Sequence, residues 1–553
     1  MTRPGIQLSV SIALGLALAA GLAAQEGPTL IPIEGPFVVD IDLRDLPAAP
    51  SWQPGDPIGI IPEGYLDEAQ DIDPEAERAV GSSAGPSGES EVAQGGFFQV
   101  NVAGLGFSGV FPPDTVGDVG PNHYIQMTNR GGGSNVLVLG KAGNTLVPAF
   151  DLDSLWMGGG PCDNGLGDPI VIHDDLADRW VLSEFASAGN HFCIYVSQTA
   201  DPVAGGWFLY DLTTPNFPDY PKYGAWPDAY YVTTYEPPSL GVYALNRTAM
   251  LAGMPAGSAI RFTVPALTAA PRDTRVLPAH NDGGTPDPGE PNYIFRTIEE
   301  AQDPGNPVDR IEIREFHVDF AVPGNSTLTL TDTIPLADFE IPDFENPVPP
   351  RSCVPQPGTV NELDALWGRA LMQLQWLDHD GYSTLVVSQP EGAGSDITTW
   401  GQRWWELRQS DAAGAGWTVF QEGTYSPDTE HRWMGSAAMN GAGEIAVGYS
   451  VSSSAVFPSI RVVGRAAADP PGELPIGEFQ AVAGTNNQTA TQRWGDYSAM
   501  SVDPEDDLTF WYTQEYIVTQ NQWSTRVVSF RLDGLFTDGF ESGDTSVWDE
   551  TTN

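Results

Sequence analysis

The fold is decided by a stretch that occurs twice in the chain, as Arg432-Trp433-Met434-Gly435-Ser436-Ala437-Ala438-Met439 and as Arg493-Trp494-Gly495-Asp496-Tyr497-Ser498-Ala499-Met500. Arg, Trp, Ala and Met recur at a constant offset of 61 residues (493 − 432 = 61). Each copy is followed by a polar turn and a second apolar run, at 445–449 and 508–512. A strand, turn and strand unit that repeats at this spacing indicates an array of small sheets.

Five earlier segments follow the same pattern, with first strands at 114–119, 168–172, 220–226, 275–279 and 369–376. Apolar runs between the units bring each repeat to about four strands, which is the composition of a propeller blade. The sequence therefore predicts an all-β fold, a β-propeller of seven four-stranded blades. Pairing of an early strand at 98–102 with the last one at 525–530 would close the ring and remove exposed edges. The alternative architecture is two stacked β domains divided near residue 350.

The segments outside the repeats define the expected domain organisation. Residues 1–24 have the basic start, apolar run and small-residue cleavage site of a secretory signal peptide. Residues 25–95 are acidic and rich in Pro and Gly, which predicts a largely disordered leader and linker. The propeller is expected over 96–535 with a Pro-rich insertion at about 300–365, and 536–553 form a short acidic tail.

The charge of the chain restricts its partners. The formal net charge is -49 over 553 residues, which argues against nucleic acid and anionic membrane surfaces because both require a basic footprint. No stretch after the signal peptide is apolar enough to span a membrane. The mature protein is therefore expected to be secreted, outside the cell or at its surface, with a carbohydrate or a cell-surface protein as partner.

Three cysteines are present, Cys162, Cys193 and Cys353. Disulfides persist outside the cytoplasm, and an odd number leaves one cysteine over. Cys162 and Cys193 fall in adjacent strands of one predicted repeat, so they are the expected disulfide. Cys353 would be free, buried or paired with another chain.

The two copies, together with the run Phe510-Trp511-Tyr512-Thr513-Gln514-Glu515-Tyr516, resemble a group of secreted bacterial β-propeller proteins of unassigned activity. The resemblance covers roughly 110–530. It implies a propeller and export from the cell, and it supplies no catalytic residues. A more distant comparison is with sialidase-type propellers, whose blades carry a Ser-x-Asp-x-Gly-x-Thr-Trp turn; residues 410–417 are a loose version that occurs once.

Ligands of propellers bind over the central channel, which the first strand of each blade lines. Arg369, Arg432 and Arg493 begin three successive units at similar places. Three guanidinium groups at one mouth would bind a carboxylate or a sulfate bidentately. The structural alternative is that each Arg fixes the end of its strand through carbonyl groups or a neighbouring Asp.

Polar residues at the starts of other first strands are further channel candidates. Asp114, Asp168, Asp219 and Asp496 would supply an acid and base pair for glycoside cleavage if two carboxyl groups lay about 5–9.5 Å apart. Lys222 belongs to the same set, and Tyr220, Tyr223 and Tyr497 would stack on sugar rings. Asp residues at such positions also cap turns, and aromatic side chains also fill cores.

Metal binding has little support in the sequence. The seven His residues are scattered and no paired Cys motif exists, which argues against zinc. The acidic turns at Asp503, Asp506 and Asp507 and at 378–380 are weak candidates for Ca²⁺, and no other cofactor is expected.

The sequence taken as a whole favours an exported propeller that acts as an extracellular binding or interaction module, for a carbohydrate or another cell-surface ligand. The alternatives are a glycoside hydrolase of sialidase-like geometry and a structural surface protein. Paired carboxylates beside the arginines in one pocket would favour the enzyme, and arginines tied up in internal ion pairs would favour the binding module.

Overall fold

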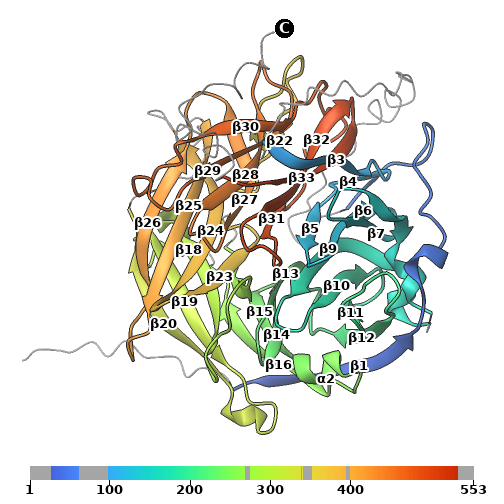
Figure 1. Ribbon diagram of the computed structural model, residues 1–553, viewed down its shortest axis with the longest axis vertical. Helices are drawn as coiled ribbons and strands as arrows, with labels where there is room; N and C mark the ends of the chain where they lie inside the picture. Colours follow the sequence, from blue (N-terminus) through green and yellow to red (C-terminus); the bar gives the residue numbers. More distant parts are fainter. Residues whose placement is uncertain are drawn as a thin grey trace, which may run out of the picture.

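The computed structural model describes residues 27–61, 97–157, 159–267, 274–337, 339, 352–393 and 399–532. Nearly all of its regular structure is β strand, in twisted sheets arranged around a common centre (Figure 1). The predicted signal peptide at 1–24, most of the predicted linker and the predicted tail at 536–553 lie outside the described residues.

The described sheets contain seven successive groups of four strands with antiparallel pairing inside each group. The first three groups are β5 (Val116–Val119), β6 (His123–Arg130), β7 (Gly133–Gly140) and β8 (Thr145–Asp151); β9 (Gly165–Asp174), β10 (Arg179–Ala186), β11 (His191–Ser197) and β12 (Trp207–Thr213); and β13 (Asp219–Ala225), β14 (Ala229–Glu236), β15 (Ser239–Asn246) and β16 (Ser258–Pro265).

The next three groups are β17 (Leu277–Asn281), β18 (Asn292–Ile298), β19 (Arg310–His317) and β20 (Thr327–Pro335); β23 (Leu374–His379), β24 (Tyr382–Ala393), β25 (Thr399–Ser410) and β26 (Thr418–Tyr425); and β27 (His431–Met439), β28 (Ile445–Ser452), β29 (Ser459–Arg465) and β30 (Ile476–Val482). The last group consists of β31 (Ala499–Val502), β32 (Phe510–Thr519), β33 (Gln522–Phe530) and, from the start of the chain, β3 (Phe98–Gly106).

The first strands of these groups form a ring. β5 contacts β9, and the contacts continue through β13, β17, β23, β27 and β31 back to β5 (Figure 1). β3 completes the last group by pairing antiparallel with β33, from Phe98 opposite Phe530 to Gly106 opposite Ser524. The all-β and β-propeller predictions are confirmed, and the two stacked domains are excluded by the closed ring. The count of seven blades stays a prediction, with which the seven groups agree.

Burial explains why the strands lack a clean apolar and polar alternation. Every residue of β28 is buried, because neighbouring sheets cover both of its faces. Eleven of the largest fully buried side chains in the described residues are Trp, and they fill the spaces between sheets. Cys162 and Cys193, the pair expected from the sequence, form a disulfide. Cys353 is buried outside that disulfide, and its sulfur accepts a hydrogen bond from the Trp400 indole at 3.0 Å.

The early segment differs from the predicted disordered leader. β1 (Thr29–Val39) lies between β16 and β12, pairs antiparallel with both, and so joins two groups at their outer edges. Ile31 and Ile33 are buried there, and the ladder satisfies the backbone polar groups, which stabilises a segment that composition alone marks as flexible. η1 (Leu43–Asp45) and β2 (Gly59–Ile60), which pairs with β4 (Val110–Phe111), continue this ordered segment.

The predicted insertion at about 300–365 also needs correction. Its first half contains β19 and β20, which are regular members of the fourth group. Its end forms β21 (Ser352–Val354) and β22 (Leu363–Asp364), a two-stranded sheet outside the groups. The remaining short elements are α2 (Arg247–Leu251), η3 (Leu152–Leu155), η4 (Pro161–Asp163), η5 (Glu300–Gln302) and η6 (Pro323–Asn325). No helix in the described residues is long and apolar enough to cross a membrane.

Candidate functional site

Four of the predicted aspartates come together near the starts of the first strands. Asp114 precedes β5, Asp168 lies in β9, Asp219 begins β13 and Asp496 precedes β31. The backbone is left-handed at Asp114 (φ 45°) and Asp168 (φ 52°), a conformation that Asp tolerates better than most residues. None of the four aspartates is more than 8% exposed. We call them, with Lys222, Arg275, Arg369 and Arg493, the central cluster.

Hydrogen bonds join the central cluster across the closure of the ring. The Asp496 amide donates to Asp114 Oδ1 at 2.7 Å, and the Arg493 guanidinium donates to Asp496 Oδ1 at 3.1 Å. Asn129 on β6 donates to Asp114 Oδ2 at 2.7 Å and accepts from the Asp168 amide at 2.8 Å. These contacts hold the carboxylates of Asp114 and Asp496 in place.

Aromatic rings hold the cations of the cluster. The ammonium group of Lys222 lies 3.5 Å from the ring centroid of Tyr220 and 4.0 Å from that of Tyr497. The guanidinium groups of Arg369 and Arg275 lie 5.0 and 5.6 Å from the same Tyr220 ring. The tyrosines therefore serve as internal cation–π partners in this structure. Tyr223 is buried against Phe192 in the core instead, so it does not join the cluster.

Burial shifts the pKa values of the cluster in opposite directions. Desolvation, followed by repulsion from Asp496, raises the pKa of Asp114 to about 7. Desolvation also raises the pKa of Asp168, with repulsion from Asp114 adding to it. The same burial lowers the pKa of Lys222 to about 7, although the nearby carboxylates oppose this shift. The uncharged forms of Asp114 and Lys222 are therefore close in free energy to their charged forms near neutral pH.

Arg432 does not belong to the central cluster, which corrects the expectation of three converging arginines. Its guanidinium pairs with Asp428 and Glu478, each at 2.8 Å, and is fully buried. The third central arginine is Arg275, which we did not select from the sequence although it begins the fourth unit at the corresponding place. Glu515 is a further buried carboxylate that was missed, and it accepts a hydrogen bond from the Gly495 amide.

Two segments cover the central cluster. The carbonyl of Ile61, at the end of the early segment, accepts a hydrogen bond from Arg493 at 3.2 Å. Asp364 on β22 attracts Arg493, and its amide donates to the carbonyl of Gln492 at 2.9 Å. Leu366 and Trp367 extend the same apolar core as Tyr220 and Tyr497. The central carboxylates are consequently closed to a large solute.

The predicted Ca²⁺ residues form internal contacts. Asp503 pairs with Lys141 and accepts from the Trp511 indole. Asp506 caps the following turn by accepting from the amides of Leu508 and Thr509, each at 2.9 Å. In the described part of the chain, no group of three or more His, Cys, Asp or Glu side chains is arranged to hold a metal ion.

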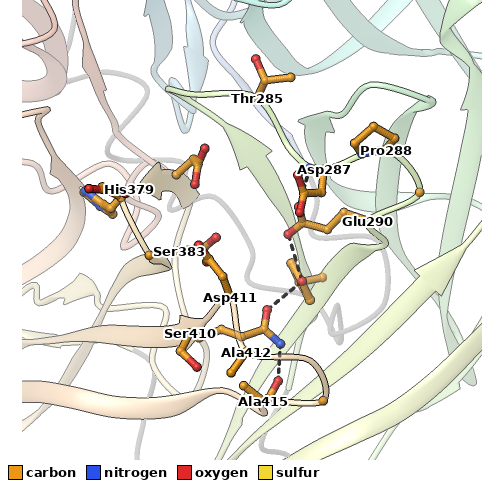
Figure 2. A pocket seen from close by; sticks show the side chains of 17 residues that line it. Thr285, Asp287, Pro288, Glu290, His379, Ser383, Ser410, Asp411, Ala412 and Ala415 are labelled. Carbon is orange, nitrogen blue, oxygen red and sulfur yellow. Dashed lines mark hydrogen bonds between the residues drawn. The ribbon is translucent and has the colours of Figure 1, made fainter.

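An open cavity of about 720 Å³ lies at the other end of the first strands. Three turns line it: residues 285–290 between β17 and β18, 378–383 between β23 and β24, and 409–415 between β25 and β26 (Figure 2). β17 and β23 pair parallel, so the turns that follow them emerge side by side. We call this cavity the turn pocket.

The lining of the turn pocket is polar and acidic. It includes the carboxylates of Asp287, Glu290, Asp378, Asp380 and Asp411, and it contains no Lys or Arg. Burial raises the pKa of Glu290 and of Asp378, where repulsion from Asp411 adds to the effect. Burial lowers the pKa of His379, which favours its neutral form. The turn pocket therefore offers many hydrogen-bond acceptors to a ligand.

A rigid polar base supports these acceptors. The Tyr293 hydroxyl lies 2.9 Å from Gln409 Oε1 and 3.1 Å from Glu290 Oε1, and the Gln409 amide donates to the Ala415 carbonyl at 2.8 Å (Figure 2). The ring of Tyr293 packs edge-on against Trp417, with centroids 5.0 Å apart. We noted the turn at 378–380 in the sequence as an acidic turn, but not its convergence with 285–290 and 409–415.

Comparisons with known proteins give no family for this chain. Neither a known protein family nor a curated protein matches it. Among solved structures, it is similar to a Bacillus subtilis arabinanase (13% identity, 56% of this chain and 97% of that one, TM-score 0.24) and to an endo-arabinanase from Bacillus licheniformis (12%, 55% and 97%, 0.25). It is also similar to the WD40 domain of SCAP from fission yeast (7%, 73% and 82%, 0.30). At these TM-scores the likenesses carry no functional argument.

Proposed function

We propose that this protein is a binding module for a neutral oligosaccharide and that the turn pocket is its binding site. The observation that carries the proposal is the open, acceptor-rich turn pocket of about 720 Å³. This volume is within the range of roughly 300–1,000 Å³ that is usual for ligand pockets.

The chemistry of the lining supports a neutral polyol. Sugar hydroxyls donate to carboxylates, and a carboxylate accepts two such bonds. The five carboxylates would repel an acidic sugar, and no lining cation would compensate for that repulsion. Sialic and uronic acids are therefore the wrong ligands for the turn pocket. The arginines that favoured them in the sequence are engaged inside the protein.

The test is binding to the mature protein, measured by thermal shift and by titration calorimetry. The probes are neutral oligosaccharides, a uronic-acid oligosaccharide and the polyamine spermidine. We expect a saturable rise in Tm with a neutral oligosaccharide. Asp411→Asn combined with Asp380→Asn should weaken that binding by at least about tenfold, corresponding to about 1.4 kcal/mol. Asp45→Asn, on the exposed η1, is the matched control and should bind as the wild type does.

Binding of the uronic acid alone, or of spermidine alone, would contradict the proposal. So would a neutral ligand that the double variant binds with unchanged affinity. The first outcome tests the class of ligand, and the second tests whether the turn pocket is the binding site.

A second candidate function is glycoside hydrolysis at the central cluster. The observation that favours it is the pair Asp114 and Asp496. Asp114 has a pKa of about 7 and accepts a hydrogen bond from the Asp496 amide, and the Asp496 carboxylate forms an ion pair with Arg493. Carboxyl groups whose environments differ in this way divide the roles of acid and base. Substrate would have to displace the covering segment around Asp364. Hydrolysis of an oligosaccharide by the wild type, lost in Asp114→Asn while the fold remains, would support this function, and its absence across the same probes would oppose it.

A further inference from the structure

A buried glutamate on β10 has no cationic partner among the described residues. Glu184 is fully buried, and neither of its carboxylate oxygens has a hydrogen-bond partner in the described part of the chain. Desolvation raises its pKa well above the ordinary value, with repulsion from Asp153 adding to the effect. Burial of an ionised carboxylate without compensation costs several kcal/mol. Something must therefore neutralise Glu184 when the protein folds.

The groups around Glu184 are oxygen atoms. The carboxylate of Asp153 and the hydroxyls of Ser134 and Tyr195 interact with it. The Ser134 and Tyr195 hydroxyls are themselves buried without a hydrogen-bond partner among the described residues. The adjacent cation, Arg130, is paired with Asp151 and does not reach Glu184. The hydroxyl groups can donate to the carboxylates, but two carboxylates side by side without a cation of their own leave negative charge here, and carboxylate and hydroxyl oxygens are also ligands of a hard cation.

Two glycines lie against the carboxylates. A Cβ atom at Gly133 would lie 3.2 Å from Asp153 Oδ2 and 3.2 Å from Glu184 Oε2. A Cβ atom at Gly165 would lie 2.5 Å from Glu184 Oε2 and 2.7 Å from the Gly133 Cα, so the two glycine backbones pack closely beside Glu184. The backbone at Gly133 has φ of 128°, which a larger residue rarely adopts. The side of Gly133 that faces the two carboxylates is thus kept free of a side chain.

The disulfide anchors the loop that supplies Asp153. Glu184 on β10 is directly opposite Cys193 on β11, so their side chains lie on the same face of the sheet. Cys193 is bonded to Cys162 in η4, which holds η4 over that face. The Gly165 amide donates to both oxygens of Asp153, at 2.9 and 3.0 Å. Asp153 is partly exposed, which gives an ion a route from solvent.

We propose that Glu184 and Asp153 bind one Ca²⁺ ion, with the hydroxyls of Ser134 and Tyr195 beside it. Ca²⁺ accepts irregular sets of oxygen ligands, whereas zinc would require His or Cys, which the site does not offer. Asp151, Asp153, Asp163 and Glu184 outnumber Arg130 locally, so the surrounding field favours a cation. This site is separate from the acidic turn at 503–507 and from the turn pocket, and it is independent of the proposed oligosaccharide binding.

The experiment is Ca²⁺ binding to the disulfide-bonded full chain after chelation. Added Ca²⁺ should raise the Tm of the wild type in a saturable way. Tb³⁺ is a second probe, because Tyr195 lies beside the site and Trp156 lies 5.9 Å from Tyr195, so both rings would sensitise its emission. Glu184→Gln should lose both responses. Asp503→Asn is the matched control in another acidic cluster and should keep both.

Gly133→Ala is the second variant if Glu184→Gln does not fold, since its methyl group would enter the space between the carboxylates. Retained binding in either folded variant would overturn the proposal. Wild-type protein that shows no Ca²⁺ shift and no Tb³⁺ emission would also overturn it, and would mean that Glu184 and Asp153 share a proton instead.

Discussion

Arg432 and Arg493 occupy the same position in two copies of one repeat, yet they have different partners. The adjacent tryptophans Trp433 and Trp494 behave alike: both are buried, and their ring centroids lie 5.5 Å apart. Arg432 lies inside β27, opposite Val451, and points toward Asp428 and Glu478. Arg493 precedes β31 and turns into the central cluster toward Asp496.

The backbone explains the divergence. In the later copy, the amides of Gly495 and Asp496 donate to the carboxylates of Glu515 and Asp114. Those amides are not available to a strand ladder, so β31 begins only at Ala499 and the predicted strand from Arg493 is shortened. The comparison teaches that a repeat conserves the packing of its apolar residues, whereas its polar residues take the partners that the local backbone permits.

The same substitution at both arginines should have unequal effects. Arg493→Met should lower the free energy of unfolding by about 3–5 kcal/mol, because it leaves Asp114 and Asp496 buried without their cation. Arg432→Met should cost less, about 2 kcal/mol, since Asp428 is half exposed and Glu478 keeps Arg461 at 2.8 Å. Urea denaturation followed by Trp fluorescence measures both values. An equal or larger cost at Arg432 would contradict the distinction between the two positions.

Much of the fold was predictable, and the reason is visible in particular residues. Trp433 and Trp494 recur because each blade must present the same apolar shape to its neighbour. The closure by β3 was predictable because an unpaired edge at β33 would be unfavourable. β1 was not predictable, since its composition is that of a linker and only its pairing with β12 and β16 orders it.

The candidate site was predictable only in part. Asp114, Asp168, Asp219 and Lys222 begin equivalent strands, so their convergence follows from the ring. Arg432 was misplaced because sequence spacing does not reveal a β-bulge, and β27 has one between Trp433 and Ser436, which changes the side that Arg432 takes relative to the rest of its strand. The turn pocket required the parallel pairing of β17 with β23, which no sequence pattern predicts.

The central cluster should make stability depend on pH through Asp114. Its folded pKa is about 7, whereas an unfolded Asp titrates near pH 3.9. Between these values the folded state holds a proton that the unfolded state has released, so stability falls as the pH rises. Asp114→Asn lacks this proton. Between pH 4 and pH 7, the free energy of unfolding of the wild type should therefore fall by about 2–4 kcal/mol relative to that of the variant.

Urea denaturation across that range measures the relative loss, and the difference between the two proteins removes the contributions of other carboxyl groups. Glu478→Gln is a useful control of opposite sign, because ion pairs with Arg432 and Arg461 lower the pKa of Glu478 despite its burial, so the contribution of Glu478 to stability does not fall as the pH rises. Parallel pH profiles for the wild type and Asp114→Asn would mean that Asp114 is ionised in the folded protein.

Among these substitutions, removal of the exposed carboxylate that pairs with Arg432 should change the free energy of unfolding least. Asp428 lies 2.8 Å from Arg432, but its side chain is 48% exposed. Water and salt screen such a pair, and the guanidinium keeps the less exposed Glu478 as its second partner, so Asp428→Asn should lower the free energy of unfolding by less than about 1 kcal/mol. The cost should shrink further in about 1 M NaCl, where the screening length falls to about 3 Å. A loss of unfolding free energy as large as that of Arg432→Met, unchanged by salt, would contradict this prediction. It would show that the more exposed Asp428 and the less exposed Glu478 stabilise Arg432 to a similar extent.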